Sequence, residues 1–324
     1  MSNNTTEVVY SISWRDVILY SCYTTEGVIQ IVGNLLIAIA VVITKELHQK
    51  EYYLPVALAV ADFLIGCGQF SAGLRRLQVI FTYQKTVKVT KWYCMTEIHN
   101  LFFIIGGYAV PSVLLIISVE RFVACCSIQA YTKITDKRIV QLGLLAFGFS
   151  TAMFLTTLVT AYLMPQPPIF GKLCLTKWAT TLFMYLFWMW YQFGAGLASI
   201  VIYIGAMYCL KFRNHGVLSE VLRKNKARQA RVTKTLVYVI GCTFFLQSIP
   251  LFLMSAASSI GISTSAYSIV APTCWIILNI NSANNIIIYV VKNRDIRQAI
   301  AKMFGKAQKI KPISLTFSKS TTNH

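Results

Sequence analysis

Hydrophobic residues gather into seven long runs that short polar segments separate. The runs cover residues 18–44, 53–74, 95–119, 139–164, 179–210, 235–258 and 267–291. Each run is long enough to cross a bilayer, which takes about 20 apolar residues in an α-helix. A transmembrane barrel would show short alternating segments instead, and a backbone in lipid must satisfy its own hydrogen bonds. The pattern predicts an all-α membrane protein, a bundle of seven transmembrane helices.

The pattern changes after the seventh run. Within residues 292–305 the apolar positions recur at helical spacing, at Ile296, Ile300, Met303 and Phe304. Such a segment predicts a short amphipathic helix along the membrane surface. Residues 306–324 are basic and rich in Ser and Thr, and we expect a disordered cytoplasmic tail there.

Composition supports lipid as the main solvent. Of 324 residues, 56% are hydrophobic and 13% are charged, against roughly 25% charged in ordinary globular domains. The net charge of +19 suggests nucleic acid, but the basic residues cluster between the hydrophobic runs without the interleaved aromatics of a nucleic-acid groove. We therefore expect contact with membrane lipid and no nucleic acid.

The basic residues also predict the orientation. With the N-terminus outside, most of the 30 Lys and Arg residues fall on the inner side, as the positive-inside rule requires. Asn3 and Asn4 begin two overlapping glycosylation sequons, which are used on the lumenal side. We expect a multi-pass plasma-membrane protein with residues 1–17 as an extracellular tail.

Few charges interrupt the runs. Asp62 lies in the middle of the second run, where a charge costs at least ~2.5–3.5 kcal/mol and needs a partner. The third run ends abruptly in Glu120 and Arg121. Nine cysteines are scattered without a CxxC pair, so no metal cluster is expected.

Five different short motifs occur in order along the runs. They are Gly33-Asn34, Leu58-Ala59-Val60-Ala61-Asp62, Glu120-Arg121-Phe122 with Ala124 and Tyr131, Phe244 with Pro250, and the stretch from Asn281 through Asn285 to Tyr289. Together they resemble the motifs of rhodopsin-like (class A) G-protein-coupled receptors. The resemblance covers about residues 18–305 and implies a receptor domain over 18–291.

The resemblance implies a switch that couples to a heterotrimeric G protein. Its residues are Glu120, Arg121, Phe122, Tyr131, Tyr203, Arg231, Lys234, Asn285 and Tyr289. Arg121 would reach inward to Glu120 at rest and outward to the G protein when active. From the residues alone, Arg121 also fits an interfacial anchor, and the basic run 211–234 equally fits attraction to anionic lipid.

The resemblance also implies a polar cluster that holds water and a sodium ion. It would comprise Asn34, Asp62, Asn281 and Asn285; a polar staple between helices is the compatible alternative. The family further implies a disulfide between Cys94 and Cys174, both on the oxidising side. The other cysteines are most simply small apolar residues.

Polar and aromatic residues in the outer half are candidates for a ligand pocket, since polar groups at membrane depth face a cavity or another helix. They are Glu97, His99, Asn100, Phe103, Gln192, Gln247, Phe252, Trp275 and Asn279. The aromatic stretch 183–191 is better explained by helix packing and by an aromatic belt at the membrane interface. His99 is better explained as a residue at a helix end whose hydrogen bonds are satisfied.

Several positions depart from the family pattern. Ser248 replaces a tryptophan of the sixth helix, and Ala230 stands where many members carry the acid that locks Arg121. Ile128 and Ile286 replace prolines. The interval from Cys94 to Arg121 is about two residues longer than typical, and Pro111 would absorb it through a kink or bulge. Such erosion resembles the divergent nematode serpentine chemoreceptors.

The sequence therefore predicts a chemosensory receptor without catalytic residues or a cofactor beyond a sodium ion near Asp62. It would sense an extracellular small molecule or peptide, and arrestin would bind its Ser/Thr-rich tail. Because Ala230 supplies no second lock, we expect high ligand-independent activity. The alternative is a seven-helix ligand-gated channel or transporter; transporters show repeats and charged midplane sites, and here Asp62 is the one central acid.

Overall fold

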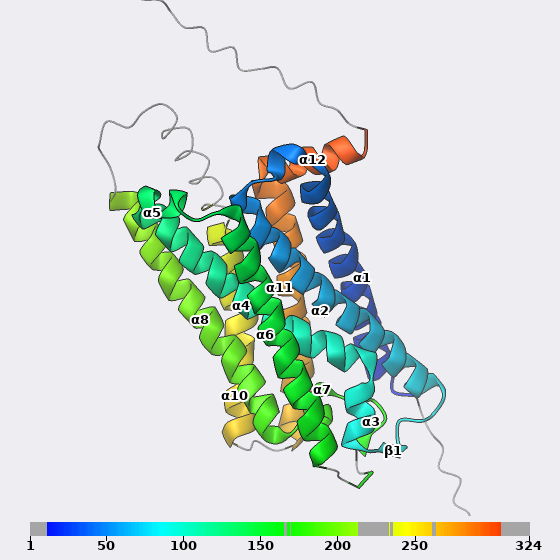
Figure 1. The fold of residues 1–324 in the computed structure, drawn as a ribbon. Coiled ribbons are helices and arrows are strands. Elements are labelled where there is room, and N and C mark those ends of the chain that lie inside the picture. The colour runs from blue at the N-terminus through cyan, green and yellow to red at the C-terminus, as the bar shows by residue number, and fades with distance from the viewer. Residues whose placement is uncertain are drawn as a thin grey trace, which may run out of the picture.

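A computed structural model describes residues 12–164, 167–168, 170–212, 233, 236–260 and 264–305. Within them, seven helices are long and apolar enough to cross a membrane, and they lie side by side in one bundle (Figure 1). They are α1 (Trp14–Ile43), α2 (Lys50–Phe81), α4 (Ile98–Cys126), α6 (Asp136–Leu163), α8 (Leu182–Phe212), the helix Leu236–Ile260 and α11 (Thr264–Lys292). The predicted seven-helix bundle is confirmed.

Short elements occupy the two ends of the bundle (Figure 1). One end, here called the α12 end, carries η1 (Lys45–Leu47), α5 (Ile128–Thr132) and α12 (Arg294–Met303). The other, called the sheet end, carries β1 (Lys88–Val89), α3 (Lys91–Thr96), β2 (Phe170–Gly171) and α7 (Thr176–Ala179). There β1 pairs antiparallel with β2, Lys88 opposite Gly171 and Val89 opposite Phe170.

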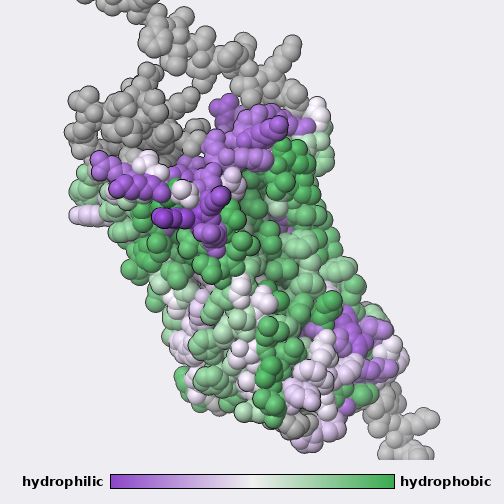
Figure 2. Space-filling view, viewed as in Figure 1, coloured by the Kyte–Doolittle hydropathy of each residue, from purple (hydrophilic) through white to green (hydrophobic). Residues whose placement is uncertain are grey.

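The surface matches a bilayer. Figure 2 shows a largely hydrophobic middle on the visible face of the bundle, with hydrophilic residues gathered towards its two ends. Large apolar side chains of the spans are exposed, among them Leu144, Leu145 and Phe183, each at least 65% exposed. Exposed apolar area of this extent marks a lipid-facing surface.

The short helix after the seventh span is present as predicted. Asn293 caps α12 by accepting hydrogen bonds from the backbone N–H groups of Asp295 and Ile296, at 3.1 and 3.2 Å. Ile296 and Ala299 are buried against the bundle. The hydroxyl of Tyr52 on α2 donates a 2.7 Å hydrogen bond to Asp295, which fastens α12 across the end of the bundle.

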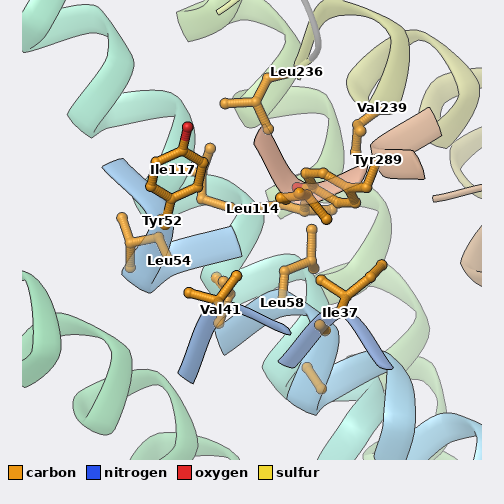
Figure 3. Close-up of a cluster of buried hydrophobic side chains, with 14 of the residues drawn as sticks. Ile37, Val41, Tyr52, Leu54, Leu58, Leu114, Ile117, Leu236, Val239 and Tyr289 are labelled. Atoms are coloured by element: carbon orange, nitrogen blue, oxygen red, sulfur yellow. The ribbon is translucent and has the colours of Figure 1, made fainter. Parts of the chain in front are cut away.

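The core at the α12 half joins all seven spans. Figure 3 shows Ile37, Leu58, Leu114, Val239 and Tyr289 converging there. These five side chains come from α1, α2, α4, the helix Leu236–Ile260 and α11, and buried side chains of α6 and α8 belong to the same cluster. Because one apolar cluster joins seven spans, rearrangement of one helix at this end requires its neighbours to repack.

Two details differ from the sequence-based picture. The third run is broken at Glu97, whose extended backbone (φ −66°, ψ 129°) separates α3 from α4. Helix α4 stays α-helical through Pro111, so the predicted bulge is wrong, while the alternative of a kink at this proline stays a prediction; the interruption lies at Glu97. Second, residues Phe244–Ser248 form a π-helical turn, η2, just before Pro250 in α10 (Ile249–Ile260); such turns are frequent at functional sites.

Candidate functional site

Glu120 and Arg121 form a buried ion pair near the α12 end of α4. The guanidinium Nε and Nη2 each donate to one carboxylate oxygen of Glu120, at 2.5 Å. Both side chains are almost fully buried, and the hydroxyl of Tyr131 on α5 accepts a third bond at 3.5 Å. Bidentate geometry makes this a strong pair, and Arg121 therefore points into the bundle instead of anchoring to lipid headgroups.

Tyrosines of two further spans lie at this end. The Tyr203 hydroxyl of α8 donates a hydrogen bond to the backbone oxygen of Thr233. Tyr289 of α11 is buried, and its hydroxyl lacks a hydrogen-bond partner among the described residues. Phe122 packs on α8 instead: a Cβ on Gly205 would lie 3.2 Å from its ring.

Some switch residues lie outside the part of the chain that the structure describes. These are Ala230, Arg231 and Lys234, and the sequons at Asn3 and Asn4 are outside it too. The structure shows the predicted contact between Arg121 and Glu120. The absence of an acid at Ala230 is an observation from the sequence alone.

Asp62 is fully buried at mid-bundle. Its carboxylate accepts hydrogen bonds from the Ser282 hydroxyl at 2.8 Å and from Asn285 Nδ2 at 3.0 Å, both on α11. Asn34 is not a direct partner: it donates to the backbone oxygen of Gln30, one turn earlier, at 3.0 Å. The cluster therefore joins α2 to α11, and Ser282 is the member that the motif comparison missed.

Asn281 also departs from its expected contact. Its Nδ2 donates to Gln247 Oε1 of η2 at 3.1 Å and lies 3.5 Å from the Thr243 hydroxyl. Asn281 thus ties α11 to the sixth span instead of to Asp62. The two asparagines of this motif, Asn281 and Asn285, hold different helices.

The residues around Asp62 suit the sodium ion that the family resemblance implies. Sodium is a hard cation and prefers carboxylate, hydroxyl and amide oxygens, as other hard cations do. Besides the carboxylate and the Ser282 hydroxyl, the amide oxygen of Asn285 is buried and lacks a partner within the described residues. Asp62, Ser282 and Asn285 would hold the ion, which would supply positive charge to the buried carboxylate.

A cavity of about 40 Å³ lies between several spans, towards the sheet end of the bundle. Its lining residues are Ile65, Phe103, Gly107, Val110, Trp188, Gln192, Gln247, Trp275, Leu278, Asn279 and Ser282. Trp188 stacks on Trp275 with ring centroids 5.8 Å apart. This volume admits a few waters or a small chemical group, so a larger ligand requires the two indoles to move.

The cavity lining is uncharged among the residues described. Two buried N–H donors there, Trp188 Nε1 and Gln192 Nε2, have no hydrogen-bond partner within the described chain. Leaving a buried donor unpaired costs about 1–3 kcal/mol. An uncharged group that accepts hydrogen bonds would remove this cost.

Five of the predicted pocket residues line the cavity and four do not. The five are Phe103, Gln192, Gln247, Trp275 and Asn279. Glu97 instead pairs with Arg75 at 3.1 Å, and Phe252 is half exposed beside Phe193. His99 and Asn100 are buried and hydrogen-bond the Cys174 carbonyl oxygen, at 3.1 and 3.4 Å, so they position the loop that carries Cys174.

Two cysteine pairs are joined in the structure. Cys94 of α3 is bonded to Cys174, with Cα atoms 4.9 Å apart, and the predicted disulfide is confirmed. Cys126 of α4 is bonded to Cys209 of α8, with Cα atoms 5.4 Å apart. The prediction that all other cysteines are small apolar residues is therefore wrong for this pair, which helix ends far apart in sequence bring together.

The cavity and the polar cluster share side chains. Ser282 lines the cavity and donates to Asp62, while Gln247 lines it and accepts from Asn281. A ligand that displaces either side chain therefore alters directly a hydrogen bond that links α11 to α2 or to the sixth span. Gln247 lies in the π-helical turn η2.

Sequence reasoning missed Gly107 and Trp188 because neither is polar or part of a motif. A Cβ on Gly107 would lie 2.6 Å from the Trp188 indole, so this glycine makes room for the ring. Trp188 sits inside the aromatic stretch 183–191, where Phe183 is 74% exposed and Trp188 is 4% exposed. Buried and exposed positions of that stretch lie on different faces of the helix, and this helical spacing is the signal that could have identified Trp188.

The fold and these sites place the chain in a known family. The family model described as "7 transmembrane receptor (rhodopsin family)" matches residues 33–289. The chain belongs to this family of multi-pass membrane receptors. Membership implies an extracellular ligand and coupling to a G protein.

Individual relatives are receptors of three kinds. Human olfactory receptor 1M1 is 28% identical over 40% of this chain and 39% of the relative. Human trace amine-associated receptor 2 is 29% identical over 73% and 67%, and human lysophosphatidic acid receptor 3 is 24% identical over 84% and 74%. The match thus spans well under half of the olfactory receptor. These relatives are receptors and not enzymes; the narrower nematode resemblance stays a prediction.

Proposed function

We propose that the chain is a chemosensory plasma-membrane receptor that activates a heterotrimeric G protein, with its N-terminus outside and its α12 end in the cytoplasm. The observation that supports this most concerns two residues, Gln247 and Ser282. Both line the cavity, and Ser282 donates to Asp62 while Gln247 accepts from Asn281. A ligand that moves either side chain biases the helices that carry the cluster.

Coupling then proceeds through helix contacts already present. Asn281 and Asp62 join α11 to the sixth span and to α2. A shift of these helices would repack the apolar core of the α12 half (Figure 3). Loosening that core would free Arg121 from Glu120 and open the space beside Tyr203, and the guanidinium would face a G protein.

The cavity favours an uncharged ligand with a hydrogen-bond acceptor. Trp188 and Gln192 offer N–H groups, whereas a cationic amine would need a carboxylate that the described lining does not supply. Burying an unpaired charge is far more costly than burying a bonded carbonyl. The names of the trace amine-associated relatives refer to an amine. The ligand of this chain would instead be uncharged.

The proposal includes three further contacts, two at the cytoplasmic side and one outside. Lipid headgroups would surround α12, whose buried face packs on the bundle. Arrestin would bind the Ser/Thr-rich residues 306–324, and glycans would occupy Asn3 or Asn4 on the outside.

A ligand screen tests the proposal. Cells that express the chain and report several second messengers would receive 4-phenylbutan-2-one, related aromatic ketones and esters, and amines of the same carbon skeletons. We expect at least one ketone or ester to raise a signal, and Gln192→Leu to weaken it while the exposed Gln141→Leu does not. Silence across the panel, or a response to amines alone, would overturn the proposed receptor or its ligand class, respectively.

A further inference from the structure

A seam between α4 and α8 runs to the α12 end of the bundle. Phe122 and Cys126 are four residues apart on α4, and Gly205 and Cys209 are four apart on α8. Residues at this spacing share one helix face. Phe122 lies against Gly205, where an added Cβ would sit 3.2 Å from its ring, and Cys126 meets Cys209 one turn further along.

The cysteine pair suits a bond that can form and break. Its Cα atoms are 5.4 Å apart, within the roughly 4.4–6.8 Å that a disulfide requires. Both residues are half-buried near the α12 ends of their helices, so neither is enclosed in the core. The backbone would not need to move for either the oxidised or the reduced form.

The pair also lies beside the coupling residues. Cys126 is the last residue of α4 and follows Arg121, while Cys209 follows Tyr203 near the end of α8. If the α12 end is cytoplasmic, as the proposed function requires, the pair faces a reducing compartment. Disulfides are rare there and, when present, are usually transient, catalytic or redox-sensing. The structural Cys94–Cys174 bond lies at the opposite end.

We propose that Cys126 and Cys209 form a reversible redox site that fastens α8 to α4. The inference rests on the proposed function, since it concerns the opening of the same α12 end. In the oxidised form the two Cα atoms cannot separate beyond about 7 Å. They are 5.4 Å apart in the structure, so the helix ends can move apart by little more than an ångström. Oxidation therefore holds the closed arrangement, and reduction releases it.

The chemistry uses a low-molecular-weight disulfide as oxidant. One cysteine thiolate attacks a sulfur of glutathione disulfide, which forms a mixed disulfide and releases one glutathione thiolate. The second cysteine, as its thiolate, then attacks the sulfur of the first and releases the other glutathione thiolate. Two thiols of the receptor are oxidised and one glutathione disulfide is reduced to two glutathione molecules; excess glutathione reverses both steps.

Membranes from cells that express the full chain provide the test. Their cytoplasmic face is exposed to glutathione disulfide or to reduced glutathione, and mass spectrometry looks for the cross-linked peptide of Cys126 and Cys209. Nucleotide exchange on added G protein is measured on the same membranes. We expect the cross-link to form under oxidation and exchange to fall by about fivefold or more.

Variants separate this site from other thiols. Cys126→Ser and Cys209→Ser should each abolish the cross-link and the oxidant effect, while the exposed Cys22→Ser on α1 keeps both. Cys126→Ala serves if the serine variant does not reach the membrane. Exchange that is unchanged although the peptide is cross-linked would overturn the inference and leave the receptor function intact.

The two readouts distinguish failure of the redox site from failure of the proposed function. Where the membranes show no exchange under any condition, the proposed function is contradicted, and with it the redox control. Where exchange depends on Arg121 but no cross-linked peptide forms under oxidation, the receptor function is supported and the redox site is overturned.

Discussion

The hydroxyl of Ser282 donates a 2.8 Å hydrogen bond to Asp62 while the same side chain lines the cavity. One small residue thus touches both the space for a ligand and a carboxylate buried at membrane depth. Asp62 accepts a second hydrogen bond from Asn285 Nδ2, at 3.0 Å. The account of this receptor depends on that short connection.

Replacing Ser282 with alanine should destabilise the protein. Asp62 would lose one of its two donors, and an underbonded buried group costs about 1–3 kcal/mol. We expect Ser282→Ala to lower the melting temperature of the detergent-purified protein, as followed by intrinsic fluorescence.

Ser150→Ala is the matched control for this change. Ser150 is also buried, but its hydroxyl donates to the carbonyl oxygen of Ala146, one turn back on α6, and not to a side chain of the described residues. Its replacement should be nearly neutral. Equal melting temperatures for the two variants would argue that Asp62 does not depend on Ser282.

Sodium should stabilise the protein through Asp62. Anything that binds the folded state alone raises its stability by mass action, and Asp62, Ser282 and Asn285 offer oxygen donors. We expect a higher melting temperature in sodium chloride than in choline chloride of equal concentration, and no difference for Asp62→Asn. A sodium effect of the same size in the variant would place the ion elsewhere.

Gly27 sets the close approach of α1 to α2. A Cβ there would lie 2.5 Å from the backbone nitrogen of Phe70, and a backbone atom cannot swing aside as a side chain can. We expect Gly27→Ala to cost about 1–3 kcal/mol through overpacking and to lower surface expression, measured by flow cytometry. Gly148→Ala on the open face of α6 has no heavy atom within 4 Å and should express normally; comparable losses would contradict the packing argument.

The fold followed from the sequence because lipid allows few choices. A backbone in hydrocarbon must bond to itself, so seven long apolar runs translate into seven helices within a few residues. The break at Glu97 was missed because Glu97 falls in the same apolar stretch as Asn100 and Phe103, and hydropathy does not report backbone direction.

The site was less predictable than the fold. Motif positions identified Asp62, Glu120 and Arg121, since charges at membrane depth must be paired. Partners set by helix rotation were not predictable: Asn34 donates to a backbone carbonyl oxygen of its own helix, and Asn281 donates to Gln247. The Cys126–Cys209 pair escaped notice because residues 83 positions apart meet only once α4 and α8 are packed.

The buried pair of Glu120 and Arg121 is the most direct test of the receptor account. Nucleotide exchange on a heterotrimeric G protein would be measured without added ligand, in membranes that carry equal amounts of each variant. Among the described residues, Glu120 is the acid that holds the guanidinium, by two 2.5 Å bonds, and we expect measurable basal exchange. Glu120→Gln should raise it and Arg121→Ala should abolish it, while Arg138→Ala, an exposed arginine of α6, should leave it unchanged. A silent basal state, or full exchange by Arg121→Ala, would contradict the account.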